Sequence, residues 1–208
     1  EHPQSPGFTL AFTTCEETTL GGSKNLEING GISRGFVFDS SHQPGRYIYS
    51  ACGAKRIYIE VLGKAAHSGI EPEKGINAVY LTAQALSKIP QGRIDEETTL
   101  NFGTISGGSA INVVPDKVIL HAEIRSFTIN RIEEETKKIK SIFETEVVNG
   151  GGKLVFQDEW DFVPYTIPET SPASFEIEGA IRTARLVPEK VISLGGSDAN
   201  SLNANGIP

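Results

Sequence analysis

The stretch that restricts the fold most is residues 55–63, KRIYIEVLG. Its apolar residues Ile57, Ile59 and Val61 fall at every second position, which is the side-chain period of a β-strand with one buried face. A longer alternating stretch, VVPDKVILHAEIRSF, occupies residues 113–127. Both stretches predict strands that have one apolar face.

Two other stretches place their apolar residues at helical spacing. AVYLTAQALSKI, residues 78–89, carries an apolar face of this kind. NRIEEETKKIKSIFETEVVN, residues 130–149, predicts the longest helix of the chain. We expect Asn130 to cap it and Glu133–Glu135 to occupy its first turn, where acidic groups complement the helix dipole.

Strand patterns follow each of these helices, at 100–108 and at 152–158. The order of elements from 55 to 158 is therefore strand, helix, strand, strand, helix, strand. This is the order of the ferredoxin-like β-α-β-β-α-β arrangement.

Segments of α/β type flank this block on both sides. They predict strands at 8–14, 35–41, 46–51 and 190–194, a short helix near 22–26, a helix from Ala173 onward, and a helix start after the glycine turn at 195–197. The simplest reading is an α/β protein in which an α+β domain is inserted into a second domain. We expect this second domain to be partial and to comprise residues 1–53 and 160–208, with the inserted domain at 54–159.

Composition and charge narrow the classes of function. The chain has 208 residues and a formal net charge of -7, which argues against nucleic acid and against an anionic membrane surface as partners. Its two cysteines, Cys15 and Cys52, form no disulfide framework and predict a reducing, cytoplasmic setting. No apolar run approaches the roughly 20 residues of a membrane-spanning helix. Because methionine is absent and both ends fall within expected elements, we expect an internal piece of a longer protein.

Two adjacent acidic residues, Glu16 and Glu17, follow the strand expected at 8–14. Asp39 ends the strand expected at 35–41, so all three carboxylates fall where ligand sites collect in α/β sheets. A divalent cation between neighbouring carboxylates removes their repulsion, and one of them can then handle a proton. Taken alone, the pair favours a solvated surface turn, because acidic side chains are mostly exposed.

Further candidate site residues lie in turns or at a strand end. They are His67 in GKAAHSGIEPEKG, Asn112 in ISGGSAINVVP, Arg125 in EIRSF, and Gly195, Gly196 and Ser197 in GGSDAN. An arginine can bind a carboxylate with two donors, and a glycine turn before a helix can bind an anion. The alternatives are a solvated loop for His67, ordinary turns for Asn112 and the glycine segment, and a surface ion pair for Arg125.

Taken in order, these segments resemble the co-catalytic dinuclear zinc aminopeptidases and carboxypeptidases, and most of all the peptidase T-like branch. The resemblance rests on TTCEETTLGGSKNL, GFVFDSS, GKAAHSGIEPEKGINAV, GTISGGSAINVVPDKVILHAEIRSF and GGSDANSLNANGIP, and it covers nearly the whole chain. It implies a zinc-dependent exopeptidase that acts on short peptides, with the inserted domain as a lid that forms a homodimer. Cobalt or manganese is an alternative to zinc as the metal of this site.

The resemblance also implies a role for each candidate residue. Glu16 is expected as general base, Glu17 and Asp39 as metal ligands, and His67 as a lid histidine that steadies the oxyanion in the partner's active site. Asn112, Arg125 and the turn of Gly195, Gly196 and Ser197 are expected to bind the substrate.

One departure from the family pattern concerns the metal ligands. The family carries a His-x-Asp motif upstream and a histidine ligand near its C-terminus, whereas the four histidines here are His2, His42, His67 and His121. We therefore predict that this chain alone does not hold a tight dinuclear zinc site, and a zinc titration tests it. Two alternatives stay open: an amidohydrolase of the same family that acts on N-acyl amino acids, and a non-catalytic dimerisation module.

Overall fold

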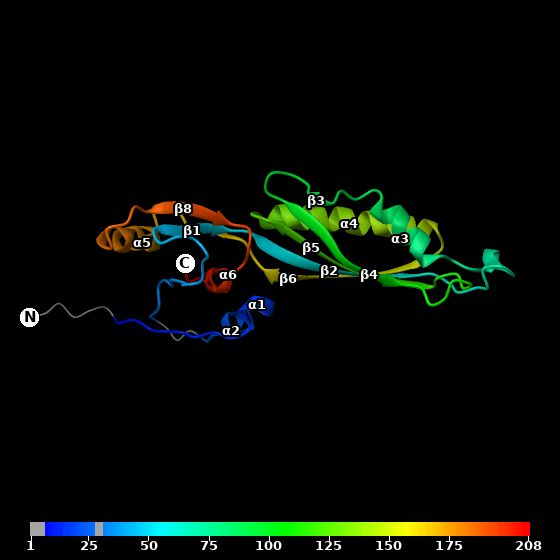
Figure 1. The fold of residues 1–208 in the computed structure, drawn as a ribbon, viewed down its shortest axis with the longest axis horizontal. Coiled ribbons are helices and arrows are strands. Elements are labelled where there is room, and N and C mark those ends of the chain that lie inside the picture. The colour runs from blue at the N-terminus through cyan, green and yellow to red at the C-terminus, as the bar shows by residue number, and fades with distance from the viewer. Residues whose placement is uncertain (1–6, 28–30) are drawn as a thin grey trace, which may run out of the picture.

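In the computed structural model, which describes residues 7–27 and 31–208, two β-sheets lie one after the other along the long axis (Figure 1). His2 lies outside the described residues. One sheet has five strands and the other has three. We call the two parts of the molecule the five-stranded unit and the three-stranded unit. No helix among the described residues is both long and apolar enough to span a membrane.

The five-stranded unit has the predicted ferredoxin-like arrangement. Its strands run antiparallel in the order β3-β4-β5-β2-β6, and its long helices α3 and α4 lie on one face of the sheet. The bounds are β2 Gly53–Leu62, the 3-10 helix η1 Pro72–Lys74, α3 Ala78–Leu86, β3 Gly92–Arg93, β4 Thr99–Gly107, β5 Lys117–Ser126, α4 Ile129–Asn149 and β6 Lys153–Phe162. The short β3 is the one strand of this unit that the sequence pattern did not predict.

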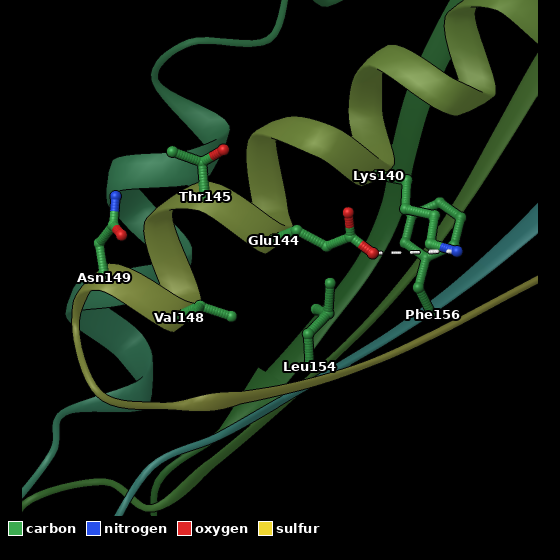
Figure 2. Close-up of a pocket in the computed structure, with 7 residues that line it drawn as sticks. All are labelled: Lys140, Glu144, Thr145, Val148, Asn149, Leu154 and Phe156. Carbon is green, nitrogen blue, oxygen red and sulfur yellow. Dashed lines mark ion pairs between the residues drawn. The ribbon is translucent and has the colours of Figure 1, made fainter.

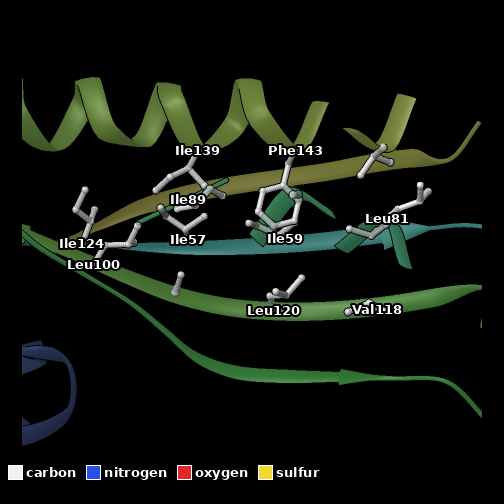
Figure 3. Packing of buried hydrophobic residues seen from close by; sticks show 14 of the residues in the cluster. Ile57, Ile59, Leu81, Ile89, Leu100, Val118, Leu120, Ile124, Ile139 and Phe143 are labelled. Atoms are coloured by element: carbon white, nitrogen blue, oxygen red, sulfur yellow. The ribbon is translucent and has the colours of Figure 1, made fainter. Parts of the chain in front are cut away.

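The core of this unit lies between the sheet and the two helices (Figure 3). Ile57, Ile59 and Val61 of β2 are buried there, as their alternation predicts. Burying one such side chain contributes about 1.5–3 kcal/mol, so this cluster is the main stabilising element of the unit. The core also contains Leu81, Ile89, Leu100, Val118, Leu120, Ile124, Ile132, Ile139, Phe143 and Val147.

The three-stranded unit is assembled from both ends of the chain. Its order is β7-β1-β8, with β1 parallel to β8 and antiparallel to β7. The bounds are α1 Glu16–Thr19, α2 Gly21–Lys24, β1 Arg46–Ala51, β7 Tyr165–Thr166, α5 Pro172–Thr183, β8 Glu189–Ser193 and α6 Asp198–Ala204. The predicted strands β1 and β8 and the predicted helices α2, α5 and α6 are confirmed, whereas β7 and α1 were not predicted.

Two predicted strands are wrong for this structure. Residues 8–14 and 35–41 form no strand, and Phe8, Phe12 and Phe38 are 82%, 92% and 98% exposed. A strand needs a neighbour for its backbone hydrogen bonds, and no described strand pairs with either segment. Their β-branched and aromatic composition was therefore not sufficient.

The predicted start of the long helix is also wrong. The helix begins at Ile129, and its N-cap is Thr128, with an extended backbone and no side-chain hydrogen bond. Asn130 therefore lies inside the helix, and Glu133–Glu135 lie beyond its first turn, where no acidic residue is found. The chain enters the helix directly from the extended backbone after β5, which leaves no position for Asn130 as a cap.

Candidate active site

The two adjacent glutamates lie in a single helical turn, α1, rather than at the end of a strand. Cys15 before the turn and Leu20 after it both have positive φ angles, 59° and 54°. Residues other than glycine rarely adopt this backbone, because it costs roughly 1–2 kcal/mol per residue. Gly22 is tied to the preceding segment, since its N–H donates to the Thr14 carbonyl over 2.8 Å. The sharp turn holds Glu16 part-buried and leaves Glu17 exposed.

Asp39 comes close to this turn. Burial raises the pKa of the Glu16 carboxyl, and the negative charges of Asp39, Glu17 and Asp198 raise it further. The structure thus brings together Glu16, Glu17 and Asp39, although segments 8–14 and 35–41 form no strands.

Asp198, the fourth carboxylate of this cluster, was missed by the sequence reasoning. It is the first residue of α6, and it accepts a hydrogen bond from the Thr13 hydroxyl. Its other oxygen, Oδ1, is buried without a hydrogen-bond partner among the described residues. The available signal was its place directly after the glycine turn that follows a strand.

The donor set at this cluster suits a metal ion only in part. Carboxylate oxygens are accepted by zinc and by harder divalent cations. Within residues 7–27 and 31–208, however, no three His, Cys, Asp or Glu side chains are arranged to hold a metal ion. The described residues therefore offer some ligands of such a site and not a complete one.

His67 and Asn112 lie together on two neighbouring loops of the five-stranded unit. The Ser68 N–H donates to the Asn112 carbonyl over 3.0 Å, and His67 forms an antiparallel bridge with Val113. His67 Nδ1 accepts the Gly69 N–H over 3.2 Å, so the proton of a neutral imidazole is on Nε2. Both side chains are exposed. The loop that follows β2 forms the right-hand end of Figure 1, far from α1.

Arg125 lies instead where the two units meet. Its guanidinium makes a two-pronged ion pair with Glu123, Nε to Oε1 over 2.6 Å and Nη2 to Oε2 over 3.1 Å. Its Nη1 donates to the Leu194 carbonyl over 3.0 Å, and its Cζ lies 5.7 Å from the centre of the Phe162 ring. The bond to Glu123 raises the pKa of Arg125. Two of its five N–H donors remain for another partner.

The glycine turn lies beside Arg125. Gly195 N–H donates to the Ser193 hydroxyl over 3.1 Å, and the Ser197 side chain caps α6. Gly196 packs against Phe162, because a Cβ at this position would lie 2.5 Å from the ring. The predicted residues thus form three groups: the acidic cluster, the His67–Asn112 loops, and Arg125 with the glycine turn.

A groove between α4 and β6 holds none of the predicted residues (Figure 2). Its volume is about 660 Å³, and the ion pair of Lys140 and Glu144 borders it over 3.9 Å. A smaller cavity, about 200 Å³, lies between the end of β6 and α6. Asn200 and Phe162 are among the residues that line it.

Comparison with known proteins identifies related chains. Residues 49–151 match the family model described as the peptidase dimerisation domain of peptidase family M20. The Bacillus subtilis protein YqjE is 37% identical over 206 residues, which cover 96% of this chain and 55% of that protein. An acetylornithine deacetylase from Pasteurella multocida is 26% identical over 167 residues, 74% of this chain and 44% of that protein.

Among solved structures, the aminopeptidase PepT from Bacillus cereus superimposes with a TM-score of 0.85 at 33% identity. The match covers 93% of this chain and 52% of that one. The chain therefore spans about half the length of the relatives it matches.

Proposed function

Since the chain belongs to peptidase family M20 through its dimerisation domain, we propose that it is the lid-bearing part of a metal-dependent exopeptidase that hydrolyses short peptides. The observation that carries this proposal is the part-buried Glu16, whose pKa is raised by burial and by the negative charges of Asp39 and Glu17. The likeness to the aminopeptidase PepT supports the peptide as substrate. The free thiols of Cys15 and Cys52 fit a reducing cytoplasm.

Glu17 and Asp39 would hold the cation, which we expect to be zinc. A divalent cation bound there would lower the pKa of a coordinated water and polarise the scissile carbonyl. We propose two ions in the intact protein, with the remaining ligands, a bridging aspartate and histidines, supplied from outside this sequence. The orphaned Oδ1 of Asp198 marks a further polar group at this site that awaits a partner.

Glu16 would carry the proton. Its raised pKa makes the carboxylate a stronger base than an exposed glutamate, which suits it to accept a proton from water near neutral pH. Glu16 would then pass this proton to the nitrogen of the leaving amine. Part-burial also limits its contact with bulk water, so the proton stays at the site.

We propose residues 54–159 as the lid domain, flanked by the partial catalytic domain at 1–53 and 160–208. His67 lies in the loop that follows β2, at the end of the five-stranded unit remote from α1 (Figure 1), and Asn112 lies in the loop beside it. This placement supports a role for both residues in the active site of a second copy. With Nδ1 occupied by the Gly69 N–H, His67 Nε2–H is left to donate to the oxyanion. Such a donor is typically worth about 3–4 kcal/mol in the transition state.

Residues of both units contribute to the proposed substrate end of the site. We propose that Asn112 binds the peptide backbone and that Arg125, with Gly195, Gly196 and Ser197, binds its carboxylate. The two free N–H donors of Arg125 support this role, although Glu123 and Leu194 already occupy the others.

The test is the Glu16→Gln variant of the intact protein that contains this chain, assayed with a tripeptide. We expect turnover to fall by about 100-fold or more, because the general base is lost. Zinc binding, measured by calorimetry, should stay at the wild-type stoichiometry, because Glu17 and Asp39 remain.

Glu144→Gln is the matched control, since Glu144 lies on α4 beside the groove of Figure 2 and outside the acidic cluster. It should retain turnover. Full turnover in Glu16→Gln would remove Glu16 from the proposed role.

The relative named acetylornithine deacetylase supports a second candidate, hydrolysis of N-acyl amino acids. Both reactions need an activated water and a grip on a carboxylate. Parallel assays with a tripeptide and with N-acetyl amino acids separate them, because only the true substrate class should reach a high kcat/KM.

A further inference from the structure

We propose that the Asn200 side chain fixes the angle between the two units and couples that angle to the glycine turn at 195–197. The proposal rests on the proposed function only in calling the five-stranded unit a lid. Its basis is a set of hydrogen bonds at the two points where the chain passes between the units.

The chain crosses between the units twice. The first crossing is Cys52, the single residue between β1 and β2. The second is Val163 and Pro164, between β6 and β7. The crossings touch, because a Cβ on Gly53 would lie 2.4 Å from Pro164 Cδ. A change of angle between the units must therefore take place at these residues.

One side chain binds both crossings. Asn200 Nδ2 donates to the Cys52 carbonyl over 3.1 Å and to the Val163 carbonyl over 2.8 Å. Asn200 Oδ1 accepts the Ser197 N–H over 3.0 Å. The residue is 1% exposed, so these bonds are shielded from water. The Asn200 side-chain amide group thus donates to both crossings, which together we call the hinge, and its oxygen accepts from the glycine turn.

A second contact joins the same parts. The Leu194 carbonyl accepts hydrogen bonds from Arg125 Nη1 and from Cys52 Sγ, each over 3.0 Å. Arg125 belongs to β5 of the five-stranded unit, whereas Leu194 opens the glycine turn of the other unit. A substrate that moves this turn therefore pulls on both the sheet and the crossing.

The hinge also has room to move. The cavity of about 200 Å³ between β6 and α6 is lined by Asn200, Val163 and Phe162. The buried hydroxyl of Ser201, which also lines it, has no hydrogen-bond partner among the described residues. Asn200 is thus a positioning residue that acts through the turn and the hinge.

A change in this angle can be measured in the intact protein as a change in the distance between two spin labels, one on each unit, by double electron-electron resonance. Labels are placed at Lys137→Cys on α4 and Ala180→Cys on α5, both exposed, in a Cys15→Ser background. Asn200→Asp keeps the oxygen that accepts the Ser197 N–H, but it loses both donors and sets a carboxylate against two carbonyl oxygens. We expect its distance distribution to shift or broaden clearly relative to wild type, and Asn200→Ala to behave in the same way.

Asn203→Ala is the matched control. Asn203 lies on the same helix, and its Nδ2 donates over 2.9 Å to Ala199 within that helix. It should keep the wild-type distribution. Distributions of Asn200→Asp and Asn200→Ala that overlap wild type would overturn the proposal.

If the Asn200 variants fail to fold, Arg125→Gln replaces them, because it removes the part-exposed contact to Leu194, together with the pair with Glu123 and the contact with the Phe162 ring. Its distribution should broaden, and an unchanged one overturns the proposal. The readout is a distance rather than activity. A result here therefore stands whether or not Glu16→Gln removes turnover, and the two proposals fail separately.

Discussion

Single residues at the junction explain why the roles of polar side chains are hard to assign from sequence. Arg125 stood out as a charge at the end of an apolar strand, which was correct, but its partners were not readable. Glu123 is two positions away and follows from strand alternation, whereas Leu194 lies 69 positions further along the chain. Only the folded arrangement of β5 against the glycine turn brings that carbonyl to the guanidinium.

Tyr165 supplies a prediction at this scale. Burial raises its pKa from 10.0 to about 12. Below about pH 10 the phenol is neutral in both the folded and unfolded states, so it adds no pH dependence. Above that pH the unfolded chain loses this proton while the folded chain keeps it, so the free energy of unfolding falls as the pH rises towards 12.

The Tyr165→Phe variant should therefore lose less stability than wild type between about pH 8 and about pH 11. The urea midpoints of the two proteins at about pH 8 and at about pH 11 measure this loss. The midpoints of the two proteins should differ little at about pH 8. Equal losses of stability in the two proteins would contradict the buried phenol as the cause.

At the scale of elements, periodicity carried most of the information. The alternation at 55–63 and the helical spacing at 130–149 predicted β2 and α4, because each pattern matches one buried face. The predictions from sequence were wrong where the structure of a segment depends on contacts with other parts of the chain. Segments 8–14 and 35–41 have strand composition but no described partner strand, and Thr128 takes the cap position expected of Asn130. The approach of Asp39 to Glu16 likewise depends on loops that no local pattern describes.

The buried stripe of α4 gives the prediction for this scale. Phe143 is fully buried between the helix and the sheet, and its ring lies 6.2 Å from that of Phe102. Phe143→Ala should lower the free energy of unfolding by about 3–5 kcal/mol, since it leaves a cavity that rigid strands cannot fill. Val148→Ala on the same helix is 62% exposed and should change it by no more than about 0.5 kcal/mol. Chemical denaturation compares the two.

For the whole molecule, the order of elements predicted the ferredoxin-like unit and its insertion between two α/β segments. The contact between the units was not predictable, because the side chains of Arg125 and Asn200 bind backbone carbonyls of residues 52, 163 and 194, which lie far from them in the sequence. Nor does the sequence pattern show how two copies assemble, since an edge strand is recognised only once the strand order is known. In the structure β4 is such an edge: β3 pairs only with Thr99 and Leu100 of it.

We expect two copies to associate through this free edge of β4, as the family match to a dimerisation domain supports. Ile105 on it is 61% exposed, an apolar side chain that a partner would cover. Light scattering should give twice 22.4 kDa for this chain, and Ile105→Lys should shift it towards the monomer. Ile129→Lys, at an exposed isoleucine on α4, should keep the wild-type mass. A dimer unaffected by Ile105→Lys would place the interface elsewhere.

The touching crossings at Gly53 and Pro164 have a consequence for protein engineering and for gene rearrangement. Ala54 is paired with Phe162, so the five-stranded unit starts and finishes at neighbouring points. A unit whose two ends are adjacent can be deleted and replaced by a short linker, or inserted into a loop of another domain, without separating the two chain ends that it joins. The same junction that sets the angle of the unit thus makes the unit exchangeable.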